Sequence, residues 1–271
     1  MRTIIITGAS DGIGAEIARQ LAAAHHGQVN LVLAARDETK LAVVAHACRA
    51  VGAQVLVVPT DVSVEPQCRA LAGAAVAAFG GIDALINNAG VSAQGLFSDV
   101  KADDLGWYER LMRVNLWGSV WCTHAALPHI LAKRGQIVAV SSLAGLVGVP
   151  GRTAYSATKF AMTGFFEALR AELKVAGVSV TTAYPGVVAT EIRYRGLNAA
   201  GVAAGSSGLR EDNAMRVEEC ASLIINGMDR RKREVVMTGR AKLALFLKLV
   251  APGVVENMAL AALKDDVKPK A

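Results

Sequence analysis

The chain has few cysteines, and its histidines lack the spacings that metal sites require. The four cysteines, Cys48, Cys68, Cys122 and Cys220, form no CxxC pair, which excludes a disulfide framework and gives no indication of a zinc site. Neither HExxH nor HxH occurs, so we interpret His25, His26, His46, His124 and His129 as structural residues and predict no metal. Free cysteines fit a reducing cytoplasm.

The sequence also lacks long uncharged apolar runs. A membrane-spanning helix needs about 18 or more consecutive apolar residues, and no such run is present. The first residues, MRTIIITGAS, enter a strand-like apolar run at once and leave no room for a charged leader with a cleavage site. We therefore expect a cytoplasmic protein without a spanning helix.

Most of the chain has no net positive charge. The formal net charge is +6, but residues 230–271 alone hold ten basic and four acidic side chains, so the first 229 residues are neutral overall. This excludes a basic nucleic-acid-binding face on the main body and confines any attraction to acidic surfaces to the C-terminal tail. With 53% hydrophobic residues, the chain can fill a large core, which excludes disorder.

Short apolar runs alternate with longer segments of helical periodicity. Strands are predicted at 3–7, 29–34, 55–58, 84–86, 136–140, 178–183 and 234–237, and helices near 13–24, 38–51, 65–79, 104–132, 154–176 and 216–229. This alternation predicts an α/β fold: a single doubly wound Rossmann domain over residues 1–240, with a seven-stranded, mostly parallel sheet and helices on both faces. We expect a mobile substrate loop at 186–214 and an amphipathic extension at 241–271.

The first predicted strand ends in a glycine-rich turn that leads directly into a helix. The turn reads TGASDGIG over residues 7–14, with glycines in GxxxGxG spacing. Glycine allows positive φ and close approach of a pyrophosphate, while the helix N-terminus offers free N–H groups. A turn without a ligand is the alternative, but the strand-turn-helix context favours dinucleotide binding. The predicted contacts are Gly8, Ser10, Asp11, Gly12, Ile13 and Gly14.

The second predicted strand ends with a cation where a carboxylate would bind the ribose hydroxyls of NAD. The chain reads Ala34-Ala35-Arg36, and an arginine there suits the 2′-phosphate of NADP. The alternative is a surface arginine that caps the strand. After the third strand, Asp61 is expected to accept a hydrogen bond from the adenine amino group, to cap the next helix, or both.

Further short motifs follow in a fixed order. They are NNAG at 87–90, Asn115, Ser142, YSATK at 155–159, and Pro185-Gly186 followed by Thr190. With the turn at 7–14 they cover nearly the whole chain, and together they resemble the short-chain dehydrogenase/reductase family. The segment TGRAKLALFLKLVAPGVV near the C-terminus resembles the hydroxysteroid-dehydrogenase-like and long-chain ketone reductase branch.

The resemblance implies a catalytic group of four residues, two of which lie on one helix. Tyr155 and Lys159 lie four residues apart and project from one helix face, where a lysine cation favours the phenolate. By resemblance Tyr155 transfers the proton, Ser142 positions the substrate oxygen, and Lys159 also bonds the nicotinamide ribose. Asn115 supports a water relay. Each residue taken singly has a structural explanation. The further cofactor contacts implied are Val62, Asn88, Ala89, Gly90, Pro185, Gly186, Val188 and Thr190.

Two apolar surfaces indicate partners. The helix that carries Tyr155 is also apolar on its opposite side; with the helical segment bearing Trp107, Trp117 and Trp121 this predicts a homodimer or homotetramer, with burial inside the chain as the alternative. In the tail, helical spacing of apolar residues predicts two short amphipathic segments. They either pack over the pocket or a neighbouring subunit, or lie peripherally on an anionic membrane surface.

The sequence therefore predicts an NADP(H)-dependent oxidoreductase that interconverts a ketone or aldehyde and an alcohol on an apolar, steroid-like or lipid-derived substrate. Leu143, Leu146, Val147 and Val187 are expected near the pocket. Arg193, Tyr194 and Arg195 either contact an acidic group or are solvated, and we favour solvated charges. One alternative is a 3-oxoacyl-carrier-protein reductase, which would need a basic docking patch. The other is a non-catalytic dinucleotide-binding regulator, against which the intact Ser142, Tyr155 and Lys159 argue.

Overall fold

The computed structural model describes residues 1–24, 26–264 and 268; the prediction for His25 and the last part of the predicted extension lie outside these residues. Its centre is one seven-stranded sheet in the order β3-β2-β1-β4-β5-β6-β7, and every pair of neighbouring strands is parallel. The strands are β1 (Arg2–Thr7), β2 (Val29–Ala35), β3 (Gln54–Pro59), β4 (Ala84–Asn87), β5 (Gln136–Val140), β6 (Ser179–Tyr184) and β7 (Glu234–Val236). The α/β doubly wound architecture predicted from the sequence is confirmed.

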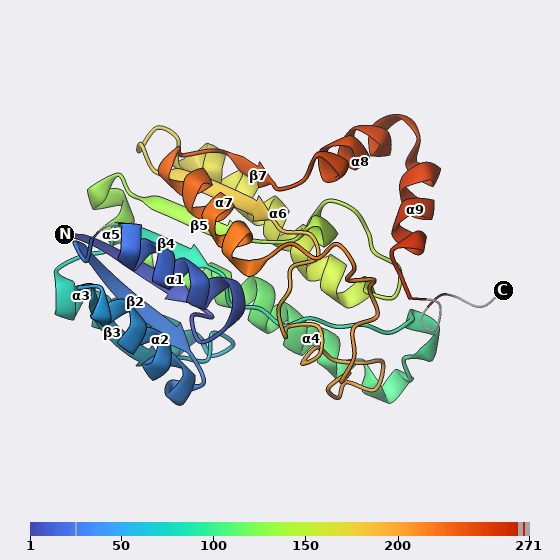
Figure 1. The fold of residues 1–271 in the computed structure, drawn as a ribbon, viewed down its shortest axis with the longest axis horizontal. Helices are drawn as coiled ribbons and strands as arrows, with labels where there is room; N and C mark the ends of the chain where they lie inside the picture. Colours follow the sequence, from blue (N-terminus) through green and yellow to red (C-terminus); the bar gives the residue numbers. More distant parts are fainter. Residues whose placement is uncertain (25, 265–267, 269–271) are drawn as a thin grey trace.

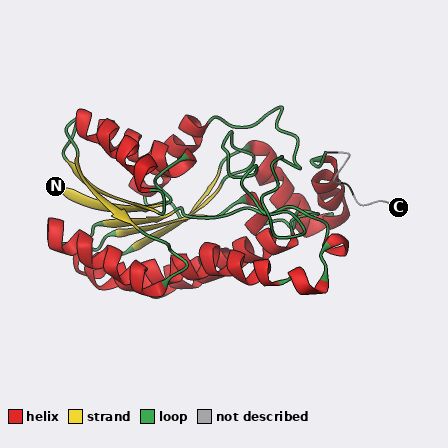
Figure 2. Cartoon of the chain, turned by 90° about the horizontal axis from the view of Figure 1, so that it is seen from below, coloured by secondary structure: helices red, strands yellow, loops and turns green. Residues whose placement is uncertain are grey.

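Helices cover both faces of the sheet (Figure 2). One face packs against α1 (Gly12–Ala24), α2 (Glu38–Ala50) and α7 (Val217–Asp229), and the other against α3 (Glu65–Phe79), α5 (Gly118–Lys133) and α6 (Thr153–Leu173). Alternation along β1 shows how the sequence produces two cores: Ile4 and Ile6 are buried in the first, and Ile5 in the second. Short 3₁₀ helices occur at Phe97–Asp99, Ala102–Asp104 and Leu143–Gly145.

The long helix predicted near 104–132 is interrupted. It consists of α4 (Gly106–Met112), one turn of π-helix (Arg113–Trp117) and α5. A π turn inserts one residue without changing the apolar character of the segment, so hydrophobic periodicity alone does not reveal it. Its consequence is the direction of the Asn115 side chain, which lies within the π turn and is fully buried.

The strand order reverses between β1 and β4, and ligands of open α/β sheets bind at the carboxyl ends of the strands at such a point. The loop between β6 and α7 lies at this end of the sheet, as do the last helices, α8 (Gly239–Val250) and α9 (Pro252–Ala261), which project from the main body (Figure 1). A backbone bridge joins Leu263 to Leu209, so the tail contacts the loop. None of the described helices is long and apolar enough to cross a membrane.

Candidate active site

The glycine-rich turn between β1 and α1 forms one wall of a cavity of about 670 Å³ at the carboxyl ends of the strands. Gly8 and Gly12 have φ angles of +66° and +52°, in the left-handed region that favours glycine. A Cβ on Gly14 would overlap the carbonyl oxygen of Gly8, so α1 approaches the turn this closely only because the position is glycine. The backbone cradle fits the pyrophosphate of a dinucleotide.

Hydrogen bonds tie the end of β4 to this turn. Thr7 Oγ1 accepts hydrogen bonds from the backbone N–H groups of Asn88 and Ala89, both at 3.0 Å. The Asn88 side-chain amide in turn donates to the carbonyl oxygens of Thr7 at 3.0 Å and Gly8 at 3.2 Å. These bonds hold residues 88–90 along the wall of the cavity, where the sequence predicts contacts to the cofactor.

Arg36, Asp61 and Val62 line the same cavity. Asp61 does not cap α3, because the N-cap residue is Val64; instead its Oδ1 accepts hydrogen bonds from Ser63 N and Ser63 Oγ, at 2.9 and 2.7 Å. The capping alternative is therefore wrong, while Asp61 remains at the cavity wall.

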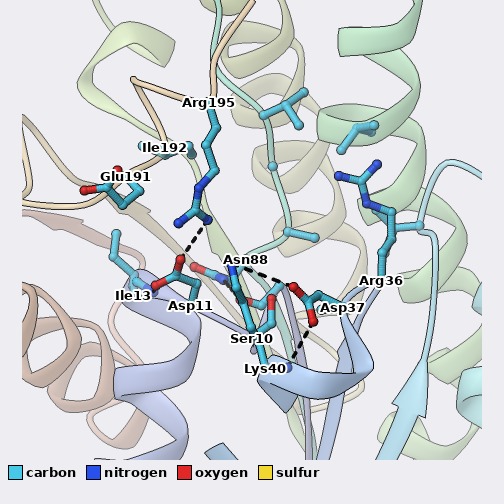
Figure 3. Close-up of a pocket in the computed structure, with 18 of the residues that line it drawn as sticks. Ser10, Asp11, Ile13, Arg36, Asp37, Lys40, Asn88, Glu191, Ile192 and Arg195 are labelled. Atoms are coloured by element: carbon cyan, nitrogen blue, oxygen red, sulfur yellow. Dashed lines mark hydrogen bonds and ion pairs between the residues drawn. The ribbon is translucent and has the colours of Figure 1, made fainter. Parts of the chain in front are cut away.

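Sequence reasoning missed two charged residues beside Arg36. Asp37 and Lys40 also line the cavity (Figure 3). Asp37 caps α2 by accepting a hydrogen bond from Lys40 N at 3.0 Å, and its other oxygen lies 3.8 Å from Lys40 Nζ. The signal was present, since an aspartate directly before a helical segment is a typical N-cap. This carboxylate is thus already paired within its own helix.

Ser142, Tyr155 and Lys159 line a small cavity of about 90 Å³ that adjoins the first, because both are lined by Asn88, Gly90 and Thr190. Ser142 caps a 3₁₀ turn: its Oγ accepts a hydrogen bond from Ala144 N at 3.1 Å and donates to Pro185 O at 3.4 Å. Pro185, Gly186 and Val188 complete this wall. The structure therefore brings the predicted catalytic side chains next to the predicted nicotinamide contacts.

Lys159 is a buried cation beside the ring of Tyr155. Its Nζ lies 5.8 Å from the ring centroid and donates to Val140 O at 3.0 Å. Burial without a carboxylate partner lowers the pKa of Lys159 to about 8. The group is thus mostly protonated at neutral pH and loses its proton more readily than an exposed lysine.

Asn115 does not line either cavity. Its Oδ1 accepts a hydrogen bond from Val91 N at 2.8 Å, and its Nδ2 donates to Val91 O at 3.0 Å and Thr158 Oγ1 at 2.9 Å. The side chain joins the segment after β4 to α6, the helix that carries Tyr155, which is the structural explanation that the sequence left open. Gly14 also lies behind the cavity wall, and all other predicted site residues line one cavity or both.

The loop at 186–214 carries two arginines whose partners the sequence did not indicate. Arg193 is buried, and its Nε lies 2.6 Å from Glu211 Oε1, so its interpretation as a solvated charge is wrong. Burial raises the pKa of Glu211, but hydrogen bonds from Arg193 and Ser207 outweigh this effect and lower it. Arg195 Nη1 lies 2.7 Å from Asp11 Oδ2 and joins the loop to the glycine-rich turn (Figure 3).

The structure also bears on the expectations for Trp107 and for the apolar residues near the pocket. Trp107 is buried, and its indole N–H donates to Ala199 O at 3.1 Å, so it packs on the loop and is not available to a partner subunit. The small cavity is lined by Ile13, Val140, Val188 and Ile192 among its apolar residues; Leu143, Leu146, Val147 and Val187 are not in its lining, although Leu143 lies against Gly186, which is.

The described residues show no alternative metal chemistry. Within 1–24, 26–264 and 268, no group of three or more His, Cys, Asp or Glu side chains could hold a metal ion. All four cysteines are buried and free. Burial raises the pKa of Cys48 to about 11 and that of Cys220 to about 12, as expected for unreactive core thiols.

Comparison with known proteins decides the family. The family model described as "short chain dehydrogenase" matches residues 2–201. The chain belongs to the short-chain dehydrogenase family. Among curated relatives, 11-beta-hydroxysteroid dehydrogenase-like 4A of Arabidopsis thaliana is 35% identical over 252 residues, which cover 93% of this chain and 81% of the relative. Mouse dehydrogenase/reductase SDR family member 7B is 32% identical over 256 residues, 92% of this chain and 77% of the relative.

These relatives place this short-chain dehydrogenase in the hydroxysteroid-dehydrogenase-like branch, and it is an oxidoreductase. A solved short-chain dehydrogenase/reductase from Burkholderia phymatum, in complex with NAD, is 28% identical, with a TM-score of 0.80 over 93% of this chain and 94% of that chain. An alcohol dehydrogenase from the archaeon Thermococcus sibiricus, complexed with 5-hydroxy-NADP, shares the fold, with 23% identity and a TM-score of 0.74 over 88% of this chain and 96% of that one.

Proposed function

We propose that this short-chain dehydrogenase uses NADP(H) to interconvert a ketone or aldehyde and the corresponding alcohol on a largely apolar substrate. The observation that carries the proposal is the continuity of the site. The backbone cradle of Gly8, Gly12 and Gly14 opens into a cavity that adjoins the one lined by Ser142, Tyr155 and Lys159. A dinucleotide held in the first would extend toward the catalytic side chains in the second.

The residues divide the chemistry between them. When bound, the nicotinamide ring supplies or accepts the hydride. The Ser142 hydroxyl orients the substrate oxygen, and the Tyr155 hydroxyl gives a proton to that oxygen during reduction or removes it during oxidation. The Lys159 ammonium lies over the Tyr155 ring and stabilises negative charge on the Tyr155 oxygen. Asn115 acts on this group by holding α6 against the segment after β4.

Arg36 supports a preference for NADP(H) over NAD(H). It lines the cofactor cavity, and its guanidinium is exposed and able to turn toward a 2′-phosphate. The neighbouring carboxylate of Asp37, which would otherwise favour ribose hydroxyls, is engaged by the N-terminus of α2 and by Lys40. Charge at this end of the cavity therefore favours the phosphorylated cofactor.

The proposed oxidoreductase function is tested by the loss of NADPH absorbance with a panel of apolar ketones and aldehydes. The reverse reaction is tested by the formation of NADPH from NADP⁺ with the matching alcohols. We expect turnover by the wild-type protein and its loss in Tyr155→Phe, with NADPH affinity unchanged within about twofold because only one hydroxyl is removed. A carrier-protein reductase would instead prefer a 3-oxoacyl-carrier protein to the free thioester. Absence of turnover with every carbonyl, alongside tight NADPH binding, would support a non-catalytic regulator.

The surfaces of α6 and α5 support assembly into a homodimer or homotetramer. Phe160 on α6 is 40% exposed, and Trp117, at the end of the π turn, is 47% exposed and stacks on Trp121. Helix α8 extends this apolar surface, since Lys248 Nζ lies 5.0 Å from the centroid of the Phe160 ring. Its own apolar residues are exposed, with Leu249 at 82%. We favour burial of this surface by another subunit over contact with a membrane.

A further inference from the structure

A buried arginine stands next to the proposed proton donor and uses only neutral hydrogen-bond acceptors. Arg152, the residue before α6, is 8% exposed, and its guanidinium carbon lies 4.8 Å from the centroid of the Tyr155 ring. Its Nε donates to Ala93 O at 3.1 Å, and its Nη2 donates to Ser92 Oγ. Within the part of the chain that the structure describes, no carboxylate pairs with it.

This arrangement differs from that of the neighbouring buried arginine. Arg193 is compensated by Glu211, whereas Arg152 is not. Burial of the guanidinium lowers the pKa of Arg152, and its attraction to Tyr155 opposes the effect. Burying a charge without a counter-charge is energetically unfavourable, and such groups concentrate at functional sites. The uncompensated charge needs an explanation in terms of what binds there.

Arg152 also lies where two cavities meet. It lines the small catalytic cavity and a larger one of about 610 Å³, and it is the single described residue common to both linings. The larger cavity is bounded by apolar side chains from several segments, including Leu96, Pro150, Leu209 and Leu263. Among the described residues, the other charged side chains that line it are Asp99, which is exposed, and Lys268.

We propose that Arg152 binds an anionic group of the substrate, so that the enzyme acts on carbonyl compounds that carry a carboxylate, with their apolar part in the 610 Å³ cavity. The proposal rests on the proposed oxidoreductase function and narrows its substrate class. A guanidinium binds a carboxylate by charge-assisted hydrogen bonds. A carboxylate held at Arg152 lies close to the Tyr155 ring, so a carbonyl of the same molecule can reach the Tyr155 hydroxyl while the apolar part extends into the larger cavity.

The test uses three positional isomers, 2-, 3- and 4-formylbenzoate, each paired with its methyl ester. The isomers vary the distance between the aldehyde and the carboxylate, and the ester removes the charge. We expect at least one acid to have a higher kcat/KM than its ester, with the difference in KM. Arg152→Gln should lower that acid-to-ester ratio about tenfold or more, the loss of one charge-assisted bond, and Arg152→Lys should restore part of it.

Arg110→Gln is the matched control. Arg110 is an exposed arginine of α4 that donates to Gly201 O, in the loop at 186–214, at 3.0 Å. Its loss should leave the acid-to-ester ratio unchanged. Calorimetry with isophthalate, terephthalate and phthalate, which contain no aldehyde, measures anion binding without turnover. We expect binding of at least one of these to wild type and about tenfold weaker binding to Arg152→Gln.

Three results would overturn the assignment, and they differ from failure of the oxidoreductase function. Wild-type enzyme that shows no preference for any acid over its ester contradicts it. So does an equal loss of acid and ester turnover in Arg152→Gln, which would show that Arg152 only positions Tyr155 and the Ser92–Ala93 segment. Dianion binding that is unchanged in Arg152→Gln is the third. Failure of the oxidoreductase function would appear separately, as no reduction of either the acids or the esters.

Discussion

The carboxylate of Asp11 occupies the groups that a diphosphate would use. It accepts a hydrogen bond from Gly12 N–H at 2.7 Å and forms an ion pair with Arg195 at 2.7 Å. All three residues line the cofactor cavity. Burial raises the pKa of Asp11, but the bonds from Arg195 and Gly12 outweigh this and lower it, so the group is ionised at neutral pH. A dinucleotide bound as proposed would therefore compete with an internal anion for the same donors.

Removing that internal anion should strengthen cofactor binding. We expect Asp11→Asn to bind NADPH about three- to tenfold more tightly, because Arg195 and the Gly12 N–H become free for the phosphates and a repulsive charge is lost; the pair is half exposed, so the gain is no larger. Fluorescence titration measures it, and the gain should shrink at high salt. Asp212→Asn, an exposed aspartate of the same loop, is the control. Weaker binding by Asp11→Asn would contradict the competition.

Cofactor preference should follow the charge at the end of β2. Arg36→Ala is expected to weaken NADPH binding about tenfold and leave NADH binding unchanged, because only the former carries a 2′-phosphate. The double variant Ala35→Asp with Arg36→Ala should then favour NADH, because a carboxylate accepts from ribose hydroxyls and repels phosphate. Both affinities are measured by titration. If wild type binds NADH more tightly than NADPH, Arg36 does not bind the 2′-phosphate.

Lys159 should limit stability while it serves the reaction. Its pKa falls from 10.5 to about 8 on folding, which corresponds to about 3 kcal/mol of destabilisation when the group is charged in both states. In cofactor-free protein we expect Lys159→Met to be more stable than wild type at pH 7 and inactive. Urea unfolding gives the difference, and Lys101→Met, an exposed lysine, should change stability little.

The gain in stability from Lys159→Met should fall as the pH rises. Below about pH 8 both folded and unfolded wild type hold the proton, so the full cost is present. Between 8 and 10.5 the unfolded chain binds more protons than the folded one, and wild-type stability gains with rising pH. The advantage of Lys159→Met should therefore shrink across this window. A constant or growing advantage would show that burial of the charge is not its cause.

The exposed face of α8 should be needed for assembly. Phe246 and Leu249 are 63% and 82% exposed, and we expect Phe246→Ser with Leu249→Ser to shift the oligomer toward monomer in analytical ultracentrifugation. Val175→Ser is the control, since Val175 is 98% exposed after α6 and away from α8. Sedimentation with anionic vesicles separates the alternatives: vesicle binding by wild type that is lost in the double variant, with the oligomer intact, would support a membrane surface.

Much of the fold and of the cofactor cradle follows from local sequence. The apolar runs that became β1 to β7 and the glycines at 8, 12 and 14 act through short-range geometry, which periodicity and spacing report. Asn115 shows where this stops, because the π turn that buries it changes register without changing composition. Arg195 and Arg152 show the same for charges: their surroundings are set by segments more than fifty residues away, and no local pattern encodes such partners.

The parallel sheet also determines how this chain can fold during synthesis. A sheet without hairpins has no neighbouring strands that can pair locally, and β1 must wait for β4, because Ile4 pairs with Ala84. Pairings of such sequence separation make folding slow and leave strand edges exposed on the way. The final edge strand, β7, emerges from the ribosome last and covers β6 only then. Translation rate and chaperone access should therefore affect the yield of this protein more than that of a helical bundle of equal length.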